Sequence, residues 1–329
     1  MPADNEPSTA DTSEAGTVET RREPGERAKA AVAALRTAEQ RPGGSKPDPI
    51  LVADNVVRTF GGLTAVDVEH VEIQRGAITA LIGPNGAGKT TFFNLLTGFD
   101  KPDSGLWKFN GDDISKLAPH KVARKGMVRT FQLTKSLARM TVLENLRLGA
   151  SDQKGERLWA SILPFLWMEQ EAKVTERADE LLELFNLVRV RNDYAGSLSG
   201  GQRKLLEMAR ALMVGPDMVM LDEPMAGVNP RLRQSLNEHI RGLREQGMTV
   251  VFVEHDMDVV RDVSDWVIVM AQGQVVAEGP PDEVMAQQAV IDAYLGAHHD
   301  APLTLEEEEQ QMQEAADVIA KEEEEEGTA

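Results

Sequence analysis

The apolar residues of this chain occur in short runs, most of them no longer than a β-strand. Apolar and polar residues begin to alternate near Ile50, still alternate over 68–73, and give way to a mainly apolar run over 78–82. Alternation is typical of strands with one buried face, and an apolar run is typical of strands buried on both faces. Residues 50 to about 110 are therefore expected to form strands around one helix, which follows the run at 78–82.

The second half of the chain repeats a unit of one strand and one helix. Beyond Met218 the expected strands are 219–221, 250–253 and 266–270, and the expected helices are 232–246 and 257–264. This alternation predicts an α/β fold with a mainly parallel sheet covered by helices. Between about Pro119 and Val214 the pattern is mainly helical. A helical subdomain over about 119–214 is therefore expected to interrupt the α/β unit.

The two ends of the chain differ from the middle in composition. Residues 1–48 are rich in Pro, Ser, Thr, Glu and Ala, which predicts a disordered N-terminal arm, although an Ala-rich stretch over 26–41 could form a short helix. The compact domain is expected over 49–297. Residues 298–329 form an acidic tail, where eleven carboxylates between Glu306 and Glu326 accompany one lysine. Such blocks of like charge favour a solvated, partly helical tail.

The overall composition excludes several classes of protein. The net charge of −19 argues against a nucleic-acid partner, which would require a wide basic surface. The chain has no cysteine, so it has no disulfide and no thiolate metal site. It also lacks an apolar run of about 18 residues, so no transmembrane helix is expected. The first residues are acidic and polar, unlike a signal peptide, and the absence of cysteine fits a cytoplasmic protein.

The segment Gly83–Thr90 has the G-x-x-x-x-G-K-[ST] spacing of a phosphate-binding loop, between the apolar run at 78–82 and a helical segment. Glycines let the backbone curl until its N–H groups point at phosphate oxygens, and the helix N-terminus favours anions. Lys89 is expected to reach the β- and γ-phosphates, and the Thr90 hydroxyl to ligate Mg²⁺. The nucleotide-binding residues expected here are Gly83, Pro84, Asn85, Gly86, Ala87, Gly88, Lys89, Thr90 and Thr91.

A second anion-binding helix start is expected at residues 198–202, Leu-Ser-Gly-Gly-Gln, which precede a helical run. Taken alone, this segment also fits a capped helix start after a glycine turn. Downstream of a phosphate loop, however, LSGGQ resembles the signature of ATP-binding-cassette (ABC) ATPases. The resemblance implies that one chain's signature closes over the ATP held by another chain, through Ser199, Gly200, Gly201 and Gln202.

Other motifs of the ABC family follow in the family's order. Residues 218–223 form an apolar run that ends in two carboxylates and resembles the Walker B segment, in which Asp222 would hold Mg²⁺ and Glu223 would be the general base. Gln132 resembles the glutamine that senses the γ-phosphate, and His255 resembles the histidine that helps to fix the attacking water. Without the phosphate loop, each would also fit a strand end or a surface position. The implied catalytic residues are Glu223, His255 and Gln132, and the implied metal ligands are Thr90, Gln132 and Asp222.

Two further positions carry less information. Phe60 precedes the phosphate loop and resembles the aromatic residue that stacks on adenine, while the alternative is a turn residue packed on the core. Asn229 stands where many ABC ATPases have an aspartate, so it keeps a hydrogen-bonding side chain without the charge. This departure bears on coupling across a dimer and does not indicate an inactive protein.

Several stretches resemble the ATPase subunits of branched-chain amino-acid importers in particular: 59–66, 93–99, 129–132, 140–146, 253–257 and 290–296. The resemblance implies an ABC-type P-loop ATPase fold with a mainly parallel core sheet, an N-terminal antiparallel β part and an inserted helical subdomain. It implies ATP and Mg²⁺ as cofactors. It also implies three kinds of partner at the cytoplasmic face of the cell membrane: two permease subunits, a second ABC ATPase chain (identical or homologous) and, indirectly, an external solute-binding protein.

The sequence leaves alternatives open. The solute could instead be urea, a lipid or another small molecule, and the chain could be a soluble ABC ATPase acting on ribosomes or DNA, although it has neither a second cassette nor coiled-coil arms. A non-catalytic protein on the same fold is disfavoured by four intact residues: Lys89, Asp222, Glu223 and His255. The apolar segment 158–168 either lies against the permease or membrane, or packs within the helical subdomain.

Overall fold

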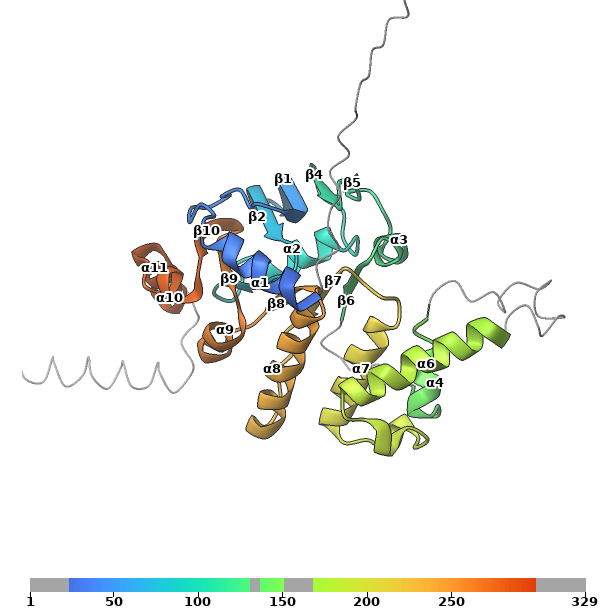
Figure 1. Ribbon diagram of the computed structural model, residues 1–329. Coiled ribbons are helices and arrows are strands. Elements are labelled where there is room, and N and C mark those ends of the chain that lie inside the picture. The colour runs from blue at the N-terminus through green and yellow to red at the C-terminus, as the bar shows by residue number, and fades with distance from the viewer. Residues whose placement is uncertain (1–23, 131–136, 151–167, 300–329) are drawn as a thin grey trace, which may run out of the picture.

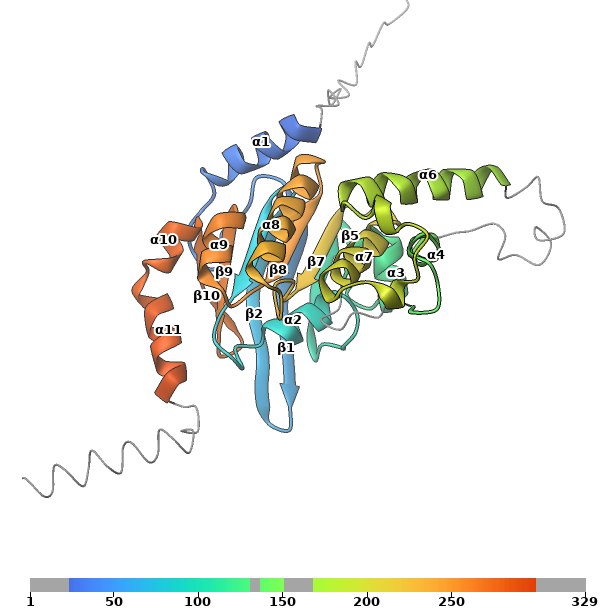
Figure 2. The same cartoon turned by 90° about the horizontal axis from the view of Figure 1, so that it is seen from below.

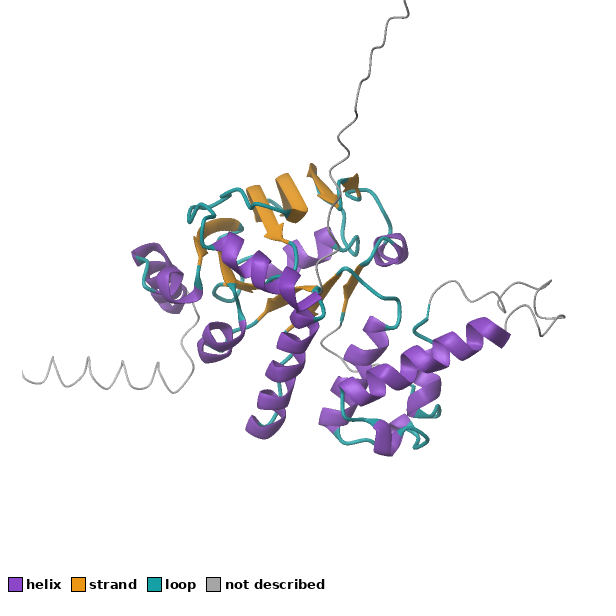
Figure 3. Cartoon of the chain, viewed as in Figure 1, coloured by secondary structure: helices purple, strands orange, loops and turns teal. Residues whose placement is uncertain are grey.

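The computed structural model describes residues 24–130, 137–150 and 168–299. Two β-sheets lie one above the other, with helices beneath and beside them (Figures 1 and 3). The smaller sheet is antiparallel, with strand order β2-β1-β4-β5. Its strands are β1 (Pro49–Phe60), β2 (Leu63–Gln74), β4 (Ser104–Phe109) and β5 (Asp112–Asp113).

The larger sheet has six strands in the order β10-β9-β3-β8-β7-β6. Its strands are β3 (Ile78–Ile82), β6 (Met127–Arg129), β7 (Met218–Asp222), β8 (Thr249–Val253), β9 (Trp266–Ala271) and β10 (Gln274–Gly279). All neighbours are parallel except β9 and β10. Every residue of β3, β7 and β8 is buried, because both faces of the sheet are covered. The mainly parallel core sheet predicted from the sequence is confirmed.

Alternate residues of the core strands enter two different hydrophobic cores. One face of the sheet packs with the antiparallel sheet and with α2 (Lys89–Leu96), which contributes Phe92, Phe93, Leu95 and Leu96. The other face packs on α8 (Pro230–Glu245) and α9 (Met257–Val263), with α10 (Pro281–Met285) and α11 (Gln288–His299) nearby. The helix that follows the phosphate loop therefore lies between the two sheets, and its packing in this core fixes the position of its first turn.

The range 119–214, expected to be a helical subdomain, also contains a core strand. α3 (Pro119–Arg124) packs on β6, and β6 pairs with β7, so both belong to the α/β part. The helices α4 (Val142–Arg147), α6 (Met168–Leu184) and α7 (Gly200–Leu212) contact one another beside the sheet, together with the short turns η3 (Val188–Val190) and η4 (Ala195–Ser197). Trp159 and Trp167, of the apolar segment 158–168, lie outside the described residues.

The expectation of a disordered arm over 1–48 is wrong for residues 24–48. α1 (Pro24–Leu35) is a helix that contacts α8, and Ala28, Ala31 and Leu35 are buried. Figure 2 shows α1 lying across the end of α8. Small alanine side chains allow a helix to approach a neighbour closely; the Ala31 methyl group lies 3.6 Å from where a Cβ on Gly76 would stand. The short helix that the sequence allowed over 26–41 is thus observed at Pro24–Leu35, packed on the domain instead of lying within a disordered arm.

A buried ion pair holds the end of the N-terminal segment against β9 and β10. Lys46 Nζ donates to Glu278 Oε2 at 3.0 Å, and both side chains are almost inaccessible to solvent. The same carboxylate accepts hydrogen bonds from Gly44 N and Trp266 Nε1, and the Lys46 ammonium lies 4.7 Å from the centre of the Trp266 ring. The charged atoms of the pair thus have partners, which offset part of the cost of taking them out of water.

Replacing Lys46 with Met should destabilise the protein by about 3 kcal/mol, because Glu278 would be left buried without a counter-charge. A shift of the urea unfolding midpoint to lower concentration would measure this loss. The double variant Lys46→Met/Glu278→Met should recover part of it, because no unpaired charge remains. An unchanged midpoint in Lys46→Met would contradict the role of the pair.

Among residues 24–130, 137–150 and 168–299, no helix combines the length and the apolar composition needed to cross a bilayer.

Candidate nucleotide site

The phosphate loop predicted at Gly83–Thr90 connects the buried strand β3 to α2. All three of its glycines have backbone conformations that side chains rarely adopt, with φ of 148° at Gly83, 77° at Gly86 and 96° at Gly88. A Cβ at Gly83 would stand 2.0 Å from the Met270 carbonyl oxygen, and one at Gly88 would stand 2.3 Å from that of Ala65. Only glycine fits at either position. The loop therefore keeps its curled backbone, and α2 begins directly at Lys89.

Lys89 is the charged group of this loop. Its side chain is buried, and Nζ donates to the carbonyl oxygens of Gly83 at 2.6 Å and Pro84 at 2.9 Å. Burial lowers the pKa of Lys89, and the negative charges of Glu223 and Asp222 oppose this shift. The ammonium group therefore lies within electrostatic reach of both strand-end carboxylates. The hydroxyl of Thr90 belongs to the same first turn of α2, at an exposed position.

Glu223 and His255 meet at the carboxyl ends of two neighbouring parallel strands. Asp222 ends β7 opposite Val253 of β8, so the residues that follow both strands come together. His255 Nε2 lies 2.8 Å from Glu223 Oε1, within hydrogen-bond distance. Glu223 has φ of 47°, a left-handed conformation that is uncommon for residues other than glycine and typical of functional sites. The two predicted catalytic side chains thus form one unit.

Glu254 supports this unit and was not identified from the sequence. Its buried carboxylate accepts hydrogen bonds from the backbone N–H groups of Met225 at 2.7 Å and His255 at 3.2 Å. It thereby joins the segment after β7 to the residue after β8. Burial raises the pKa of Glu254, and the two N–H groups oppose the shift. The only sequence signal was a carboxylate directly after the apolar run over 250–253.

Asp222 has one occupied and one free carboxylate oxygen. Oδ2 accepts a hydrogen bond from Arg129 NH2 at 2.5 Å, within an ion pair whose two side chains are both buried. Oδ1 is buried and has no hydrogen-bond partner among the described residues. An unpartnered buried oxygen is costly unless something binds it. Arg129 itself was not singled out in the sequence, where it was only part of the stretch 129–132.

Asp222 and Thr90 are suitable ligands for Mg²⁺. The free oxygen of Asp222 is a hard anionic donor, and Mg²⁺ is commonly bound through one or two protein oxygens together with phosphates and water. In the described part of the chain, no group of three or more His, Cys, Asp or Glu side chains is arranged to hold a metal ion. The third expected ligand, Gln132, lies outside the described residues.

The signature residues form the exposed N-terminus of α7. Ser199 is the N-cap, whose Oγ accepts from Gln202 N, while Gln202 Oε1 accepts from Ser199 N at 3.0 Å. This is a capping box, so the capped-helix interpretation is confirmed, while anion binding at the same helix N-terminus stays a prediction. The adjoining cavity of about 710 Å³ is lined by residues 199–205 and by the loop and helix start over 226–235, and by no residue of the phosphate loop.

Phe60 is at the turn between β1 and β2 and is 46% exposed, so part of its ring is accessible. Its stacking on a base stays a prediction. The guanidinium of Arg58 lies 4.4 Å from the ring centre. Arg58 is in turn fixed by Asp100 and Asp103, through contacts of 3.0 to 3.1 Å.

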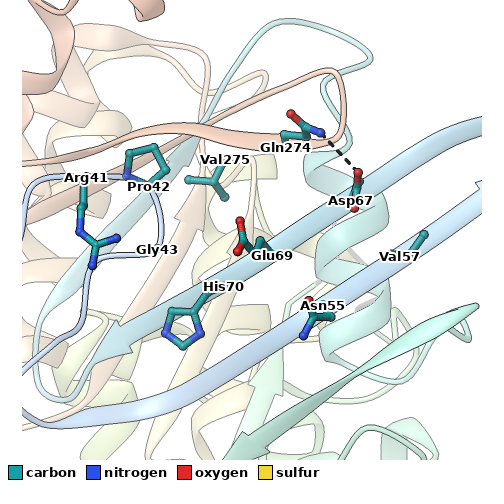
Figure 4. Close-up of a pocket in the computed structure, with 10 residues that line it drawn as sticks. All are labelled: Arg41, Pro42, Gly43, Asn55, Val57, Asp67, Glu69, His70, Gln274 and Val275. Atoms are coloured by element: carbon teal, nitrogen blue, oxygen red, sulfur yellow. Dashed lines mark hydrogen bonds between the residues drawn. The ribbon is translucent and has the colours of Figure 1, made fainter.

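A further cavity of about 430 Å³ lies over β1, β2 and β10 (Figure 4). The carboxylates of Asp67 and Glu69 line it, and Gln274 donates to Asp67 at 3.3 Å. None of its lining residues belongs to the phosphate loop, the signature or the ends of β7 and β8. It is therefore separate from the nucleotide site.

The loop, the strand-end carboxylates and the parallel sheet define a P-loop nucleotide-binding protein of the ATP-binding-cassette class. The family profile described as ABC transporter matches residues 67–226, and the profile described as branched-chain amino acid ATP-binding cassette transporter matches residues 274–300. The chain belongs to the ABC transporter family.

Individual relatives agree with this assignment. The chain is 42% identical over 248 residues to the probable branched-chain amino acid transport ATP-binding protein LivG of Archaeoglobus fulgidus, which covers 75% of this chain and 96% of that protein. It is 41% identical over 250 residues to the high-affinity branched-chain amino acid transport ATP-binding protein BraF of Pseudomonas aeruginosa. The alignment covers 75% of this chain and 98% of BraF.

A solved structure of the ADP conformation of an ATP-binding cassette of an ABC transporter has a TM-score of 0.66 and 39% identity, over 75% of this chain and 99% of that one. The family resemblance and the fold class expected from the sequence are thus confirmed.

Proposed function

We propose that this chain is the ATP-hydrolysing subunit of an ABC importer for branched-chain amino acids. The observation that carries the proposal is the convergence of Lys89, Glu223 and His255 at one edge of the core sheet. A phosphate-binding cation and a carboxylate–histidine pair are the groups that transfer of a phosphoryl group to water needs.

Each side chain has a distinct role in the proposed reaction. Lys89 and the backbone N–H groups of the loop hold the phosphates at the start of α2. Glu223 accepts the proton of the attacking water, and His255, hydrogen-bonded to Glu223, orients that water toward the γ-phosphate. Thr90 and the unpartnered Oδ1 of Asp222 would hold Mg²⁺, which would supply positive charge to balance the phosphate oxygens. Phe60 stacks on the base.

We infer that the complete site needs a second ABC ATPase chain. The signature helix N-terminus is exposed, and the cavity beside it contains no phosphate-loop residue of the same chain. Ser199 and the amides of α7 are therefore available to phosphates held elsewhere. Closure of two such chains on two ATP molecules would be driven by the higher affinity of the closed state for ATP.

The remaining partners follow from the same proposal. Two permease subunits would receive the movement through the region of Gln132, and an external solute-binding protein would act indirectly through them. The chain would then be peripheral, at the cytoplasmic face of the membrane. The similarity to LivG and BraF, which are named for branched-chain amino acid transport, supports amino-acid transport. The profile matched at 274–300 supports branched-chain amino acids over urea or lipid.

The test is transport by the assembled complex. The chain would be purified with the permease subunits that copurify with it, reconstituted in vesicles with the matching binding protein, and supplied with ATP inside and labelled leucine outside. We expect ATP-dependent leucine uptake that labelled urea does not show. ATP hydrolysis without leucine uptake would contradict the proposed solute, and absence of hydrolysis in the complex would contradict the proposed enzyme.

A further inference from the structure

Arg129 connects three parts of the nucleotide site. It is the last residue of β6, and its buried guanidinium donates from NH2 to Asp222 Oδ2 at 2.5 Å and from NH1 to Asn94 Oδ1 at 2.6 Å. Asn94 belongs to α2, the helix that begins at Lys89. The guanidinium thus bridges the helix of the phosphate loop and the carboxylate at the end of β7.

Two aromatic rings enclose the same guanidinium. Its central carbon lies 5.7 Å from the ring centre of Phe93 and 5.9 Å from that of Phe99, distances at which a cation is attracted to an aromatic ring. The Arg129 side chain is only 6% exposed. An arginine held by two hydrogen bonds and two rings has little freedom, so it fixes the orientation of whatever it binds.

We propose that Arg129 is a positioning residue for the Mg²⁺ ligand Asp222, an inference that rests on the proposed function. By occupying Oδ2, the guanidinium fixes the carboxylate plane and leaves Oδ1, buried and unpartnered, as the oxygen that binds the cation. Groups that orient a metal ligand commonly change metal affinity by about 10–100-fold when they are removed. The positive charge of Arg129 also balances Asp222 in a buried position, where an unpaired carboxylate would be costly.

A competing role for Arg129 predicts the opposite effect of its removal on Mg²⁺ binding. If the guanidinium merely occupied the place of the cation, its removal would strengthen Mg²⁺ binding, because a positive charge near the site would be lost. The bond to Asn94 argues for positioning, since it holds Arg129 in place independently of Asp222. The Mg²⁺ concentration needed for nucleotide binding therefore distinguishes the two roles: it rises on removal of a positioning residue and falls on removal of a residue that occupies the cation's place.

The experiment is a Mg²⁺ titration of nucleotide binding by Arg129→Met and Arg129→Lys. Fluorescent methylanthraniloyl-ADP would be bound first in EDTA and then at rising Mg²⁺ concentrations. We expect unchanged affinity in EDTA, and a half-saturating Mg²⁺ concentration raised about tenfold in Arg129→Met. Arg129→Lys keeps the charge without the forked geometry, so it should give a smaller increase, and it serves if the Met variant does not fold.

Two control variants separate the possible causes. Lys46→Met also breaks a buried ion pair, but one formed with Glu278 away from the site, so it should lower stability without changing the Mg²⁺ requirement. Asp222→Asn should raise the half-saturating Mg²⁺ concentration. An unchanged concentration in this variant would overturn the proposed Mg²⁺ site itself. If Asp222→Asn responds but both Arg129 variants show a wild-type or lower requirement, or lose affinity equally in EDTA, the positioning role is overturned.

Discussion

Replacing Glu223 with Gln should reduce ATP turnover about 10³-fold while leaving ATP affinity within about threefold of the wild type. Glutamine preserves the shape of the side chain, and its amide can still bind His255, but it cannot take a proton from water. The carboxylate lies 2.8 Å from His255 Nε2, so the substitution changes one proton acceptor in an otherwise intact site. Phosphate release by the assembled complex and equilibrium binding of labelled ATP would measure the two effects.

The matched control for this prediction is Glu238→Gln, which makes the same chemical change at an exposed position on α8. It should leave turnover and affinity unchanged. A turnover close to that of the wild type in Glu223→Gln would show that another group accepts the proton. Hydrolysis-deficient chains should also remain paired around ATP, which size-exclusion chromatography with ATP and Mg²⁺ would detect as a persistent dimer.

Replacing Lys89 with Ala should weaken the binding of ATP and ADP about 100-fold, which corresponds to about 2.7 kcal/mol. The ammonium group supplies charge-assisted hydrogen bonds to phosphate oxygens in a buried position, where such bonds are strong. Isothermal titration calorimetry with ADP would measure the loss without interference from hydrolysis.

The substitution also removes the hydrogen bonds from Lys89 to the carbonyls of Gly83 and Pro84. Thermal unfolding without nucleotide must therefore be compared, to separate a collapsed loop from a lost phosphate contact. Lys173→Ala, at an exposed position on α6, is the matched control and should bind ADP normally. Wild-type affinity in Lys89→Ala would remove this lysine from the nucleotide site.

The parts of the site that sequence could predict are those encoded locally. The loop at Gly83–Thr90 needs only its own residues, and the strand ends at Asp222 and His255 follow from apolar runs that stop at a polar residue. Because parallel strands place their carboxyl ends at one edge, their proximity also followed from the fold class. Gln132 remains a prediction, since it lies outside the described residues.

The features that sequence reasoning missed depend on contacts between distant segments. Lys46 and Glu278 are 232 positions apart, and Arg129 and Asp222 are 93 apart, so no local pattern could pair them. β6 has only three residues, too few for a recognisable strand pattern within a region that is mainly helical. The short Ala-rich helix that the sequence allowed over 26–41 is observed as α1, but its contact with α8 joins segments about 200 positions apart, and no local pattern predicts that contact.

The ion pair of Lys46 with Glu278 limits how this protein can be shortened. A version trimmed to start at β1 would keep the buried glutamate and discard the lysine that neutralises it. Such a fragment would contain every residue proposed to bind ATP, and its folded state would still be less stable because Glu278 is unpaired. Laboratory versions intended to isolate the cassette should therefore retain the chain from α1 onward.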